Sequence, residues 1–353
     1  MLLKSRKEPV DKKIAVLAPG GTGAPIGGLL TKAGHDVVLI DQWPAHVDAM
    51  KANGLRITIG TKQEPEGEIV VPVRAYHLYE VCTLHQQFDI VFLTAKAYDT
   101  RWLVQFIEPY LKSDGVLVAI QNGMTDELIS PIIGKHRSIG CVLTGGGDLL
   151  APGHVWRSRS MKHPYYTLGE LDGKTTPRLE ELVKILSDAG KVKASTDILG
   201  AKWTKLVQNC MGAIASLCNK RLWEQLDDPR YIPAVAQITK EAMQIGVALG
   251  YNLQPITGLT PESLLGPPER IARTMIVHNS QGAPEGSVSM VQHDMEVGRP
   301  SEVAGHLNGL LVRKGREVNV PTPMNEAMIA LHARLVRGEL PWDASNMDLV
   351  PKL

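Results

Sequence analysis

A segment near the start of the chain, residues 13–41, constrains the fold more than any other part of the sequence. It reads KIAVLAPGGTGAPIGGLLTKAGHDVVLID. Residues 14–17 form a brief apolar run bounded by proline and glycine, which is typical of a buried strand. A glycine-rich turn, an apolar-periodic segment and a second apolar run at 36–40 follow, and Asp41 ends the second run. This order predicts two parallel strands joined by a crossover helix.

The turn and the acid after the second strand together predict a dinucleotide site. N–H groups and the positive dipole end at a helix start favour a pyrophosphate, and an acid ending the second strand can bind both ribose hydroxyls of NAD. We read the turn as Ala18-x-Gly20-x-x-Gly23, with Pro25 in the first helical turn, where a missing N–H matters least. The predicted cofactor-binding residues in this segment are Ala18, Gly20, Gly21, Thr22, Gly23 and Asp41.

This phasing of the glycines makes two structural predictions. Gly20 should lie where the backbone approaches phosphate, and Gly23 should lie where helix and strand pack closely. A rival phasing, Gly21-x-Gly23-x-x-x-Gly27, is one residue too long for the pattern. A glycine-rich turn can also occur in an α/β protein without a nucleotide, but the complete strand, turn, helix, strand and acid favour cofactor binding.

Size, charge and hydropathy exclude several classes of protein. The 353 residues suffice for two domains, and 44% of them are hydrophobic, yet no run of about 18 apolar residues predicts a spanning helix. With 38 basic and 37 acidic residues, the net charge of +1 argues against nucleic acid or a membrane surface as the main partner. The basic start, MLLKSRKEPVDKK, lacks a signal-peptide core, so we expect a frayed leader.

The cysteines and histidines favour a reducing compartment and give no metal site. Cys82, Cys141, Cys210 and Cys218 form no C-x-x-C pair, and the eleven histidines are scattered. We therefore expect a cytoplasmic protein with free thiols and no metal ion.

The pattern along the chain divides near residue 196. Before it, strands and helices alternate, which predicts a parallel sheet covered by helices, with an antiparallel extension within 153–169. After it, the pattern is helical. We expect a dinucleotide-binding domain at 1–196, a helical substrate and dimerisation domain at 197–353, and a loose or partner-contacting tail at 341–353. The expected strands are 14–17, 36–40, 90–94, 115–120 and 138–144, and the expected helices are 102–111, 174–189, 197–219, 232–249, 302–316 and 323–336.

Polar residues that could bind cofactor or substrate follow two buried strands and lie on one apolar helix. Lys96 follows the strand at 90–94, and Asn122 follows the strand at 115–120, although a surface lysine and a turn asparagine would look the same. Lys205 and Asn209 are four residues apart and so share a helix face, while we place Lys202 and Gln208 on other faces. Taken alone, Lys205 reads as a solvated lysine, but at a cleft it could titrate near neutral pH and exchange a proton.

The order of several motifs adds a family resemblance. The glycine turn, TAKAYDT, QNGM, APGH, LGELDG, KWTKLVQN and SMVQHDMEVGRPSE follow one another at the family's spacing. Over residues 13–336 the chain resembles ketopantoate reductase (2-dehydropantoate 2-reductase) and its relatives. The resemblance implies an α/β fold, with an N-terminal Rossmann-type domain, an all-helical C-terminal domain and an active site between them. It also implies a small-molecule substrate, and we expect a homodimer.

The resemblance also assigns roles. It implies that Lys205 is the general acid, that Glu302 hydrogen-bonds the reacting oxygen, and that Asn209 binds substrate. Ser289 matches a serine that contacts the substrate carboxylate, next to an apparent one-residue insertion at His293. Lys96 and Asn122 match cofactor-proximal positions.

Two departures from the family pattern refine the expectation. Asp41 and Gln42 stand where the family has a neutral residue followed by the arginine that receives the 2′-phosphate of NADP, so we expect NAD, with NADP disfavoured. Ala213 stands where the family has a second substrate asparagine, which argues against ketopantoate itself.

The sequence therefore predicts an NAD-dependent oxidoreductase acting on the CH–OH group of a hydroxy acid or alcohol, or on its keto form. One alternative is an NADPH-dependent 2-dehydropantoate 2-reductase. The alternative from another class is a dinucleotide sensor without catalysis, which has no chemical need for both Lys205 and Glu302.

Overall fold

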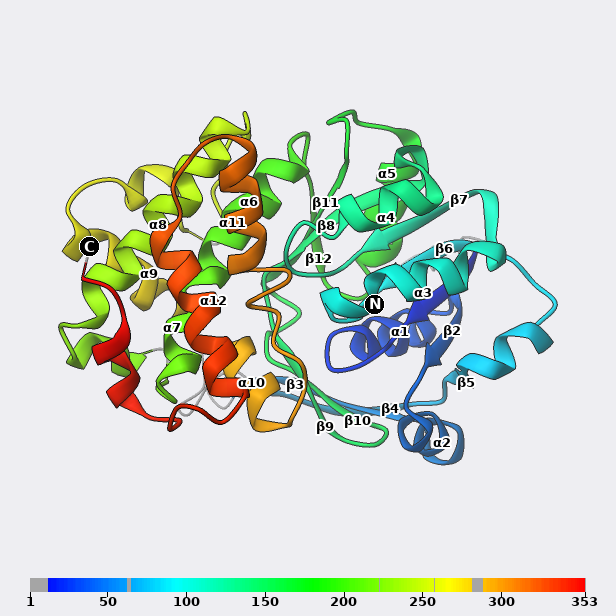
Figure 1. Cartoon of the computed structure of the whole chain (residues 1–353). Coiled ribbons are helices and arrows are strands. Elements are labelled where there is room, and N and C mark those ends of the chain that lie inside the picture. The colour runs from blue at the N-terminus through cyan, green and yellow to red at the C-terminus, as the bar shows by residue number, and fades with distance from the viewer. Residues whose placement is uncertain (1–11, 62–64, 222, 257, 281–287, 353) are drawn as a thin grey trace, which may run out of the picture. The chain divides into compact units, whose positions relative to one another are not determined.

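The computed structural model describes residues 12–61, 65–221, 223–256, 258–280 and 288–352 (Figure 1). The expected leader at residues 1–13 lies almost entirely outside them. The chain divides into two compact units. Unit 1 comprises the residues up to Gln121 together with Thr125–Ile198, and unit 2 comprises Asn122–Met124 and Leu199–Leu353.

Unit 1 is built on an eight-stranded sheet in the order β12-β11-β8-β7-β6-β1-β2-β5. All neighbours are parallel except β11 and β8, which confirms the parallel sheet with an antiparallel addition. The strands are β1 Lys13–Leu17, β2 Asp36–Asp41, β5 Arg74–His77, β6 Phe88–Leu93, β7 Leu111–Ala119, β8 Ser138–Leu143, β11 Pro164–Glu170 and β12 Lys191–Ala194.

Helices cover both faces of this sheet, as its fully apolar strands predict. Ile14 and Val16 of β1 join the core formed with α1 and α5, while Ala15 and Leu17 join the core formed with α3 and α4. The helices of unit 1 are α1 Gly23–Lys32, α2 Pro44–Asn53, α3 Thr100–Ile107, α4 Asp126–Ile133 and α5 Pro177–Leu186. The expected helix at 102–111 ends at Ile107, because a short 3-10 turn containing Pro109 leads directly into β7.

A second sheet of four strands, which the sequence did not predict, packs on α1. Its order is β4-β3-β10-β9, with β4 Pro65–Val71, β3 Leu55–Gly60, β10 His154–Arg157 and β9 Gly147–Ala151. A Cβ on Gly27 would lie 2.8 Å from Leu39 of β2, and one on Gly28 would lie 2.6 Å from Ile57 of β3. Helix α1 thus lies between the two sheets, and Gly27 is a packing glycine, which supports the phasing through Ala18, Gly20 and Gly23.

Unit 2 is helical, as predicted. Its helices are α6 Ile198–Cys210, α7 Gly212–Leu217, α8 Tyr231–Ala248, α9 Pro268–Ser280, α10 Met290–Glu296, α11 Asn308–Glu317 and α12 Pro323–Val336. The single helix expected at 197–219 is interrupted at Met211, and the helix expected from Glu302 begins only at Asn308. Within the described ranges, no helix combines the length and the apolar character needed to cross a bilayer.

The prediction of a loose C-terminal tail is wrong for the described part of it. The Trp342 indole N–H donates to the carbonyl of Ser216 at 2.6 Å, and Asn346 Nδ2 donates to the carbonyl of Leu217 at 2.9 Å (Figure 1, red). Asn346 and Met347 are buried. The tail therefore satisfies the last carbonyl groups of α7, which have no partner within that helix.

Candidate functional site

In unit 1, the glycine-rich turn lies where the strand order of the large sheet reverses, between β1 and β6. Crevices at the carboxyl ends of strands around such a point are where ligands of open α/β sheets bind. Ala18, the first residue of the turn, has a φ of +58°. This left-handed conformation is easy for glycine and strained for alanine, so the backbone agrees with a glycine position that alanine fills here. Thr94, after β6, braces the turn by donating from Oγ1 to the carbonyl of Ala18 at 2.9 Å.

The close packing predicted at Gly23 is present in the structure, while the approach of phosphate to Gly20 stays a prediction. A Cβ on Gly20 would meet nothing within 4 Å among the described residues, so the backbone is open there. A Cβ on Gly23 would lie 2.0 Å from Thr94 Oγ1, so the start of α1 packs directly on the end of β6. Thr22 precedes α1, and its side chain makes no capping hydrogen bond to the described helix.

A third glycine of the turn has a partner that sequence reasoning missed. A Cβ on Gly21 would lie 2.4 Å from the Gly147 carbonyl oxygen, and a Cβ on Gly147 would lie 2.3 Å from the Gly21 carbonyl oxygen. The two backbones therefore touch, and neither position admits a side chain. The run of three glycines at 145–147 was the available signal.

Asp41 lies at the end of β2 and is only 7% exposed. Its Oδ1 accepts a hydrogen bond from the Trp43 N–H at 2.7 Å. Burial raises the pKa of this carboxyl above its usual range, and the N–H of Trp43 and the neighbouring His46 oppose the rise.

His46, which the sequence did not single out, joins the turn to the second sheet. The Gly153 N–H donates to its Nδ1 at 2.9 Å, and its Nε2 lies 3.1 Å from the carbonyl oxygen of Pro19. Since Nδ1 accepts and a carbonyl cannot donate, Nε2 carries the proton and the ring is neutral. Burial lowers the pKa of His46, which agrees with the neutral form.

Lys96 lies after β6, half-buried, immediately before the short turn Ala97–Asp99. The loop that carries it is held by Gln121, whose Nε2 donates to the carbonyl of Ala95 at 2.8 Å and to Thr100 Oγ1 at 2.9 Å. Gln121 is buried and follows β7. Like Gly147 and His46, it is a residue whose role sequence reasoning missed, although it directly precedes the predicted Asn122.

In unit 2, the structure brings three of the predicted residues together. Asn209 Nδ2, near the end of α6, donates to Asn122 Oδ1 at 2.9 Å, and Asn122 Nδ2 lies 3.1 Å from Met290 Sδ. Asn209 and Ser289 also line one cavity of about 100 Å³. Its described lining is Gln208, Asn209, Met211, Gly212, Asn279, Val288, Ser289, Met290 and Val291.

Ser289 is the N-cap of α10. Its Oγ accepts from the Gln292 N–H at 3.1 Å and donates to the Gly212 carbonyl at 3.3 Å. A serine whose hydroxyl accepts a hydrogen bond from an N–H of the first helical turn is a common N-cap. Ser289 therefore stabilises the start of α10 and also lines the cavity.

Lys205 lies one turn before Asn209 on α6, and it hydrogen-bonds a residue that we expected on another face of the helix. Lys205 Nζ donates to Gln208 Oε1 at 3.0 Å, so the placement of Gln208 on another face was wrong. Residues three apart on a helix are neighbours. Lys202, on the same helix, is buried, with 2% of its surface exposed.

Glu302 lies in the turn before α11 and is 3% exposed. Its carbonyl accepts from the N–H groups of His306 and Leu307. Asn308 fastens the start of α11 to the end of α6, because its Nδ2 donates to the carbonyl of Cys210 at 3.2 Å. Ala213 is fully buried and is not among the described residues that line the cavity.

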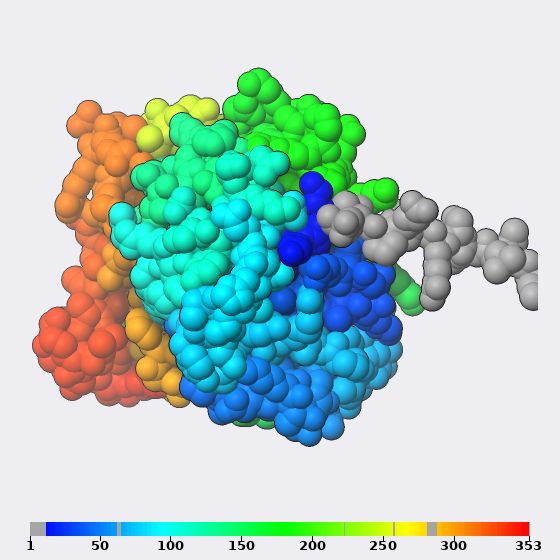
Figure 2. All heavy atoms as spheres, turned by 90° about the vertical axis from the view of Figure 1, so that its right-hand side faces the viewer, coloured from blue at the N-terminus to red at the C-terminus, as the bar shows by residue number. Residues whose placement is uncertain are grey.

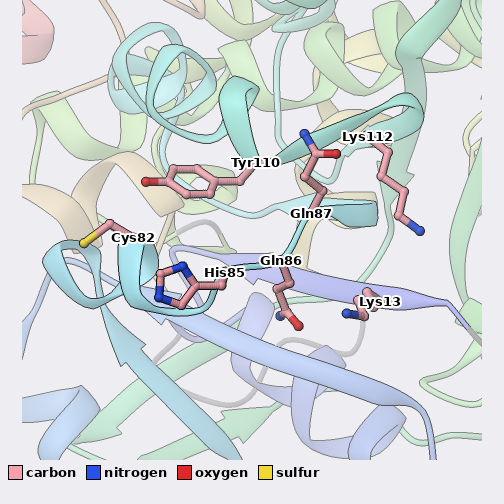
Figure 3. A pocket seen from close by; sticks show the side chains of 7 residues that line it. All are labelled: Lys13, Cys82, His85, Gln86, Gln87, Tyr110 and Lys112. Carbon is pink, nitrogen blue, oxygen red and sulfur yellow. The ribbon is translucent and has the colours of Figure 1, made fainter.

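A different hollow in unit 1 lies at the amino ends of β1, β6 and β7, opposite the glycine turn. Figure 2 shows the start of β1, in dark blue, at the surface beside the cyan segments that supply the other lining residues. Its side chains, drawn in Figure 3, are Lys13, Cys82, His85, Gln86, Gln87, Tyr110 and Lys112. In the described ranges, no group of three or more His, Cys, Asp or Glu residues is placed to hold a metal ion.

Family models and known proteins resemble the chain along most of its length. A model described as ketopantoate reductase PanE/ApbA matches residues 14–173, and one described as ketopantoate reductase PanE/ApbA C terminal matches residues 197–335. A 2-dehydropantoate 2-reductase from Archaeoglobus fulgidus is 27% identical over 332 residues, which cover 93% of this chain and 97% of that protein.

Solved structures show the same fold. A PanE/ApbA family ketopantoate reductase from Ralstonia eutropha JMP134 is 25% identical with a TM-score of 0.76, covering 93% of this chain and 99% of that one. A D-mandelate dehydrogenase solved with NADH and anilino(oxo)acetate is 22% identical with a TM-score of 0.76, covering 93% of this chain and all of that one.

Proposed function

The chain belongs to the ketopantoate reductase family and is an oxidoreductase of that superfamily; from this premise, we propose that it uses NAD to interconvert a 2-hydroxy acid, or a related alcohol, and its keto form. One observation carries the proposal. Asn209 and Ser289 line one cavity of unit 2, and Lys205 precedes Asn209 by one helical turn. An amide, a hydroxyl and an amine on adjoining positions provide what an oxygen-rich substrate needs.

The residues of unit 1 fit a dinucleotide. Gly20 offers open backbone, while Gly21 and Gly23 let the turn pack tightly, so Gly20, Gly21, Thr22 and Gly23 would hold the pyrophosphate, with Ala18 shaping the turn. Lys96, and Asn122 of unit 2, would contact the ribose or nicotinamide side. A bound nicotinamide supplies or takes up the hydride.

NAD preference rests on Asp41. Its carboxylate would accept hydrogen bonds from the ribose hydroxyls of NAD and repel the 2′-phosphate of NADP. Gln42 adds no positive charge that could offset this repulsion.

Proton transfer rests on Lys205. In the reductive direction its ammonium gives a proton to the oxygen that becomes a hydroxyl, and in the oxidative direction the neutral amine takes that proton. Asn209 and Glu302 orient the same oxygen, and Ser289 contacts the carboxylate of the substrate.

The test is a panel of 2-oxo acids assayed with NADH, together with Lys205→Ala. We expect turnover with at least one oxo acid, and a loss of kcat of about 100-fold or more with NAD affinity nearly intact. Lys240, exposed on α8, provides the matched control, and Lys240→Ala should retain full activity. Equal effects of the two substitutions would show that Lys205 has no special role.

A second candidate, 2-dehydropantoate reduction with NADPH, is favoured by the names of the curated relatives. The two candidates differ in the outcome of one assay. Turnover of 2-dehydropantoate with NADPH at an ordinary enzyme rate, about 1 to 10³ per second, would establish the second candidate and exclude ours.

We also propose that the protein is a homodimer, as the family resemblance implies. Light scattering should give a mass twice the 38.5 kDa of the chain. A mass of a single chain at micromolar concentration would contradict this.

A further inference from the structure

The amine of Lys205 is held by a chain of side-chain amides in unit 2. Lys205 Nζ donates to Gln208 Oε1 at 3.0 Å, and Gln208 Nε2 donates to Asn279 Oδ1 of α9 at 2.9 Å. Asn279 Nδ2 in turn donates to the carbonyl of Met275 at 2.9 Å, one turn earlier in the same helix. Three consecutive hydrogen bonds thus connect the lysine to the backbone of α9.

This chain has one consistent direction. A backbone carbonyl can only accept, so the amide nitrogen of Asn279 must face Met275 and its oxygen must face Gln208. The amide nitrogen of Gln208 must then face Asn279, which leaves its oxygen for Lys205. Reversing Gln208 would break the bond to Asn279 and turn an N–H toward an ammonium group. Hydrogen bonds that run in one direction also polarise one another.

The hydrogen-bonded chain lies in a largely buried and uncharged environment. Gln208 is only 8% exposed, and the described lining of the cavity that contains Gln208 and Asn279 carries no charged side chain. A neutral amide oxygen fixes the direction of the amine without adding a formal charge. An ammonium group carries three N–H donors, so a lysine that donates to an amide oxygen can donate to a second acceptor as well.

We propose that Gln208, held in one orientation by Asn279, is a positioning residue that directs the Lys205 amine for proton transfer. Asn279 is a positioning residue one step further away. This inference rests on the proposed role of Lys205. The sequence motif around Lys205 did not indicate this arrangement, because Asn279 lies on α9, 71 residues after Gln208 in the sequence.

A direct test measures the protonation of Lys205 in the whole protein without substrate. The protein is labelled with lysine carrying ¹³C at Cε, and the Lys205 signal is identified by its loss in Lys205→Arg. We expect Gln208→Glu, which replaces the amide by a carboxylate, to raise the titration midpoint of Lys205 by about one pH unit or more. Gln208→Met, which keeps the shape but removes the acceptor, should lower the midpoint by about half a unit or more.

Asn279→Leu should act in the same direction as Gln208→Met, because the freed amide of Gln208 no longer has a fixed orientation. Gln244→Glu, an exposed change on α8, is the matched control and should leave the midpoint unchanged. A midpoint that is the same in wild type and in all Gln208 and Asn279 variants would overturn the inference. Folding of each variant is checked by its melting temperature, and the near-isosteric Gln208→Glu and Gln208→Met provide two independent readings.

Kinetics separate this inference from the proposed function. With the 2-oxo acid of highest kcat/KM in the panel, Gln208→Met should lower kcat about tenfold with little change in KM, and the pH limb of kcat should move with the titration midpoint. If Lys205→Ala abolishes activity while the Gln208 variants keep the wild-type limb, only the inference fails. If Lys205→Ala remains fully active, the proposed function fails, and the inference fails with it.

Discussion

Asp41 is the residue with the largest proposed influence on cofactor choice. We expect Asp41→Ala combined with Gln42→Arg to move the ratio of kcat/KM for NAD over NADP by at least about tenfold toward NADP, which corresponds to about 1.4 kcal/mol. Steady-state kinetics with both cofactors measure this. Glu180→Ala, an exposed change on α5, should leave the ratio unchanged. A wild type that already prefers NADP would contradict our interpretation of Asp41.

The same carboxyl should make cofactor selectivity depend on pH. Burial raises the pKa of Asp41, so as pH falls toward that raised pKa the carboxyl gains a proton and loses the charge that repels a 2′-phosphate. Selectivity for NAD over NADP should therefore be highest at neutral pH and weaken on acidification. Binding of each cofactor, followed by calorimetry between pH 8 and pH 5, would test this, and a constant ratio across the range would contradict it.

In the segment of the first strand, turn and helix, substitution by alanine should affect two glycines differently: one variant should lose stability and the other should lose NAD binding. Gly23→Ala places a Cβ against Thr94 Oγ1, which holds the turn through the carbonyl of Ala18, so we expect a loss of about 1–3 kcal/mol of stability. Gly20→Ala has space for its Cβ and should keep the wild-type melting temperature while weakening NAD binding. Thermal unfolding and NAD titration separate the two effects.

A companion variant checks the cause. Removing the Thr94 hydroxyl in Gly23→Ala/Thr94→Ala should restore part of the lost stability, because the crowded atom is gone. A double variant that is less stable than the sum of its parts would place the strain elsewhere.

The elements that could be predicted are those that carry their own local signal. Apolar runs in the sequence correctly predicted the strands β1, β2, β6 and β8. The helix predicted at 323–336 matches α12 at both ends. The second sheet was missed because β4 is mostly exposed and because β3 pairs in parallel with β10, a strand far away in the sequence. No local pattern encodes such a pairing.

One detail of the site could have been predicted from the sequence, and several others needed the tertiary structure. The hydrogen bond between Lys205 and Gln208 could have been predicted, because residues three apart on a helix are neighbours, as residues four apart are. The sequence prediction considered only the spacing of four, between Lys205 and Asn209. The roles of Asn279, His46 and Gly147 depend on contacts between distant segments, which spacing alone does not reveal. The helix expected from Glu302 starts later, at Asn308, because residues 302–307 form turns and bends.

For the molecule as a whole, buried and half-buried histidines should make stability fall in acid. Burial lowers the pKa values of His46, His306 and His332, so these rings stay neutral in the folded protein while the unfolded chain takes up protons at the ordinary value of 6.5. Each of them contributes to stability above about pH 6.5, and the contribution is lost as pH falls from there through the lowered pKa. Asp41, whose folded pKa is raised, opposes this trend only in part.

His332 offers a single-site test of that dependence. It is 2% exposed, and its Nε2 donates to the carbonyl of Ala213 at 2.7 Å. His332→Gln removes the titrating ring, so its free energy of unfolding should decline less between pH 7 and pH 5 than that of wild type, by up to about 1.4 kcal/mol for each unit of the lowered pKa. Denaturant unfolding at several pH values measures this, and parallel curves for the two proteins would refute it.

The pairing of β3 with β10 has a consequence for synthesis on the ribosome. Ile57 of β3 emerges early, but its partner Val155 follows only after four strands of the large sheet, β5 to β8, and two further α-helices, α3 and α4, have been made. Until then one face of α1, where Gly28 meets Ile57, lacks the neighbouring strand that completes its cover. A nascent chain arrested before residue 154 should therefore be cleaved by protease within its first βαβ segment, and one arrested well beyond residue 157 should resist cleavage there.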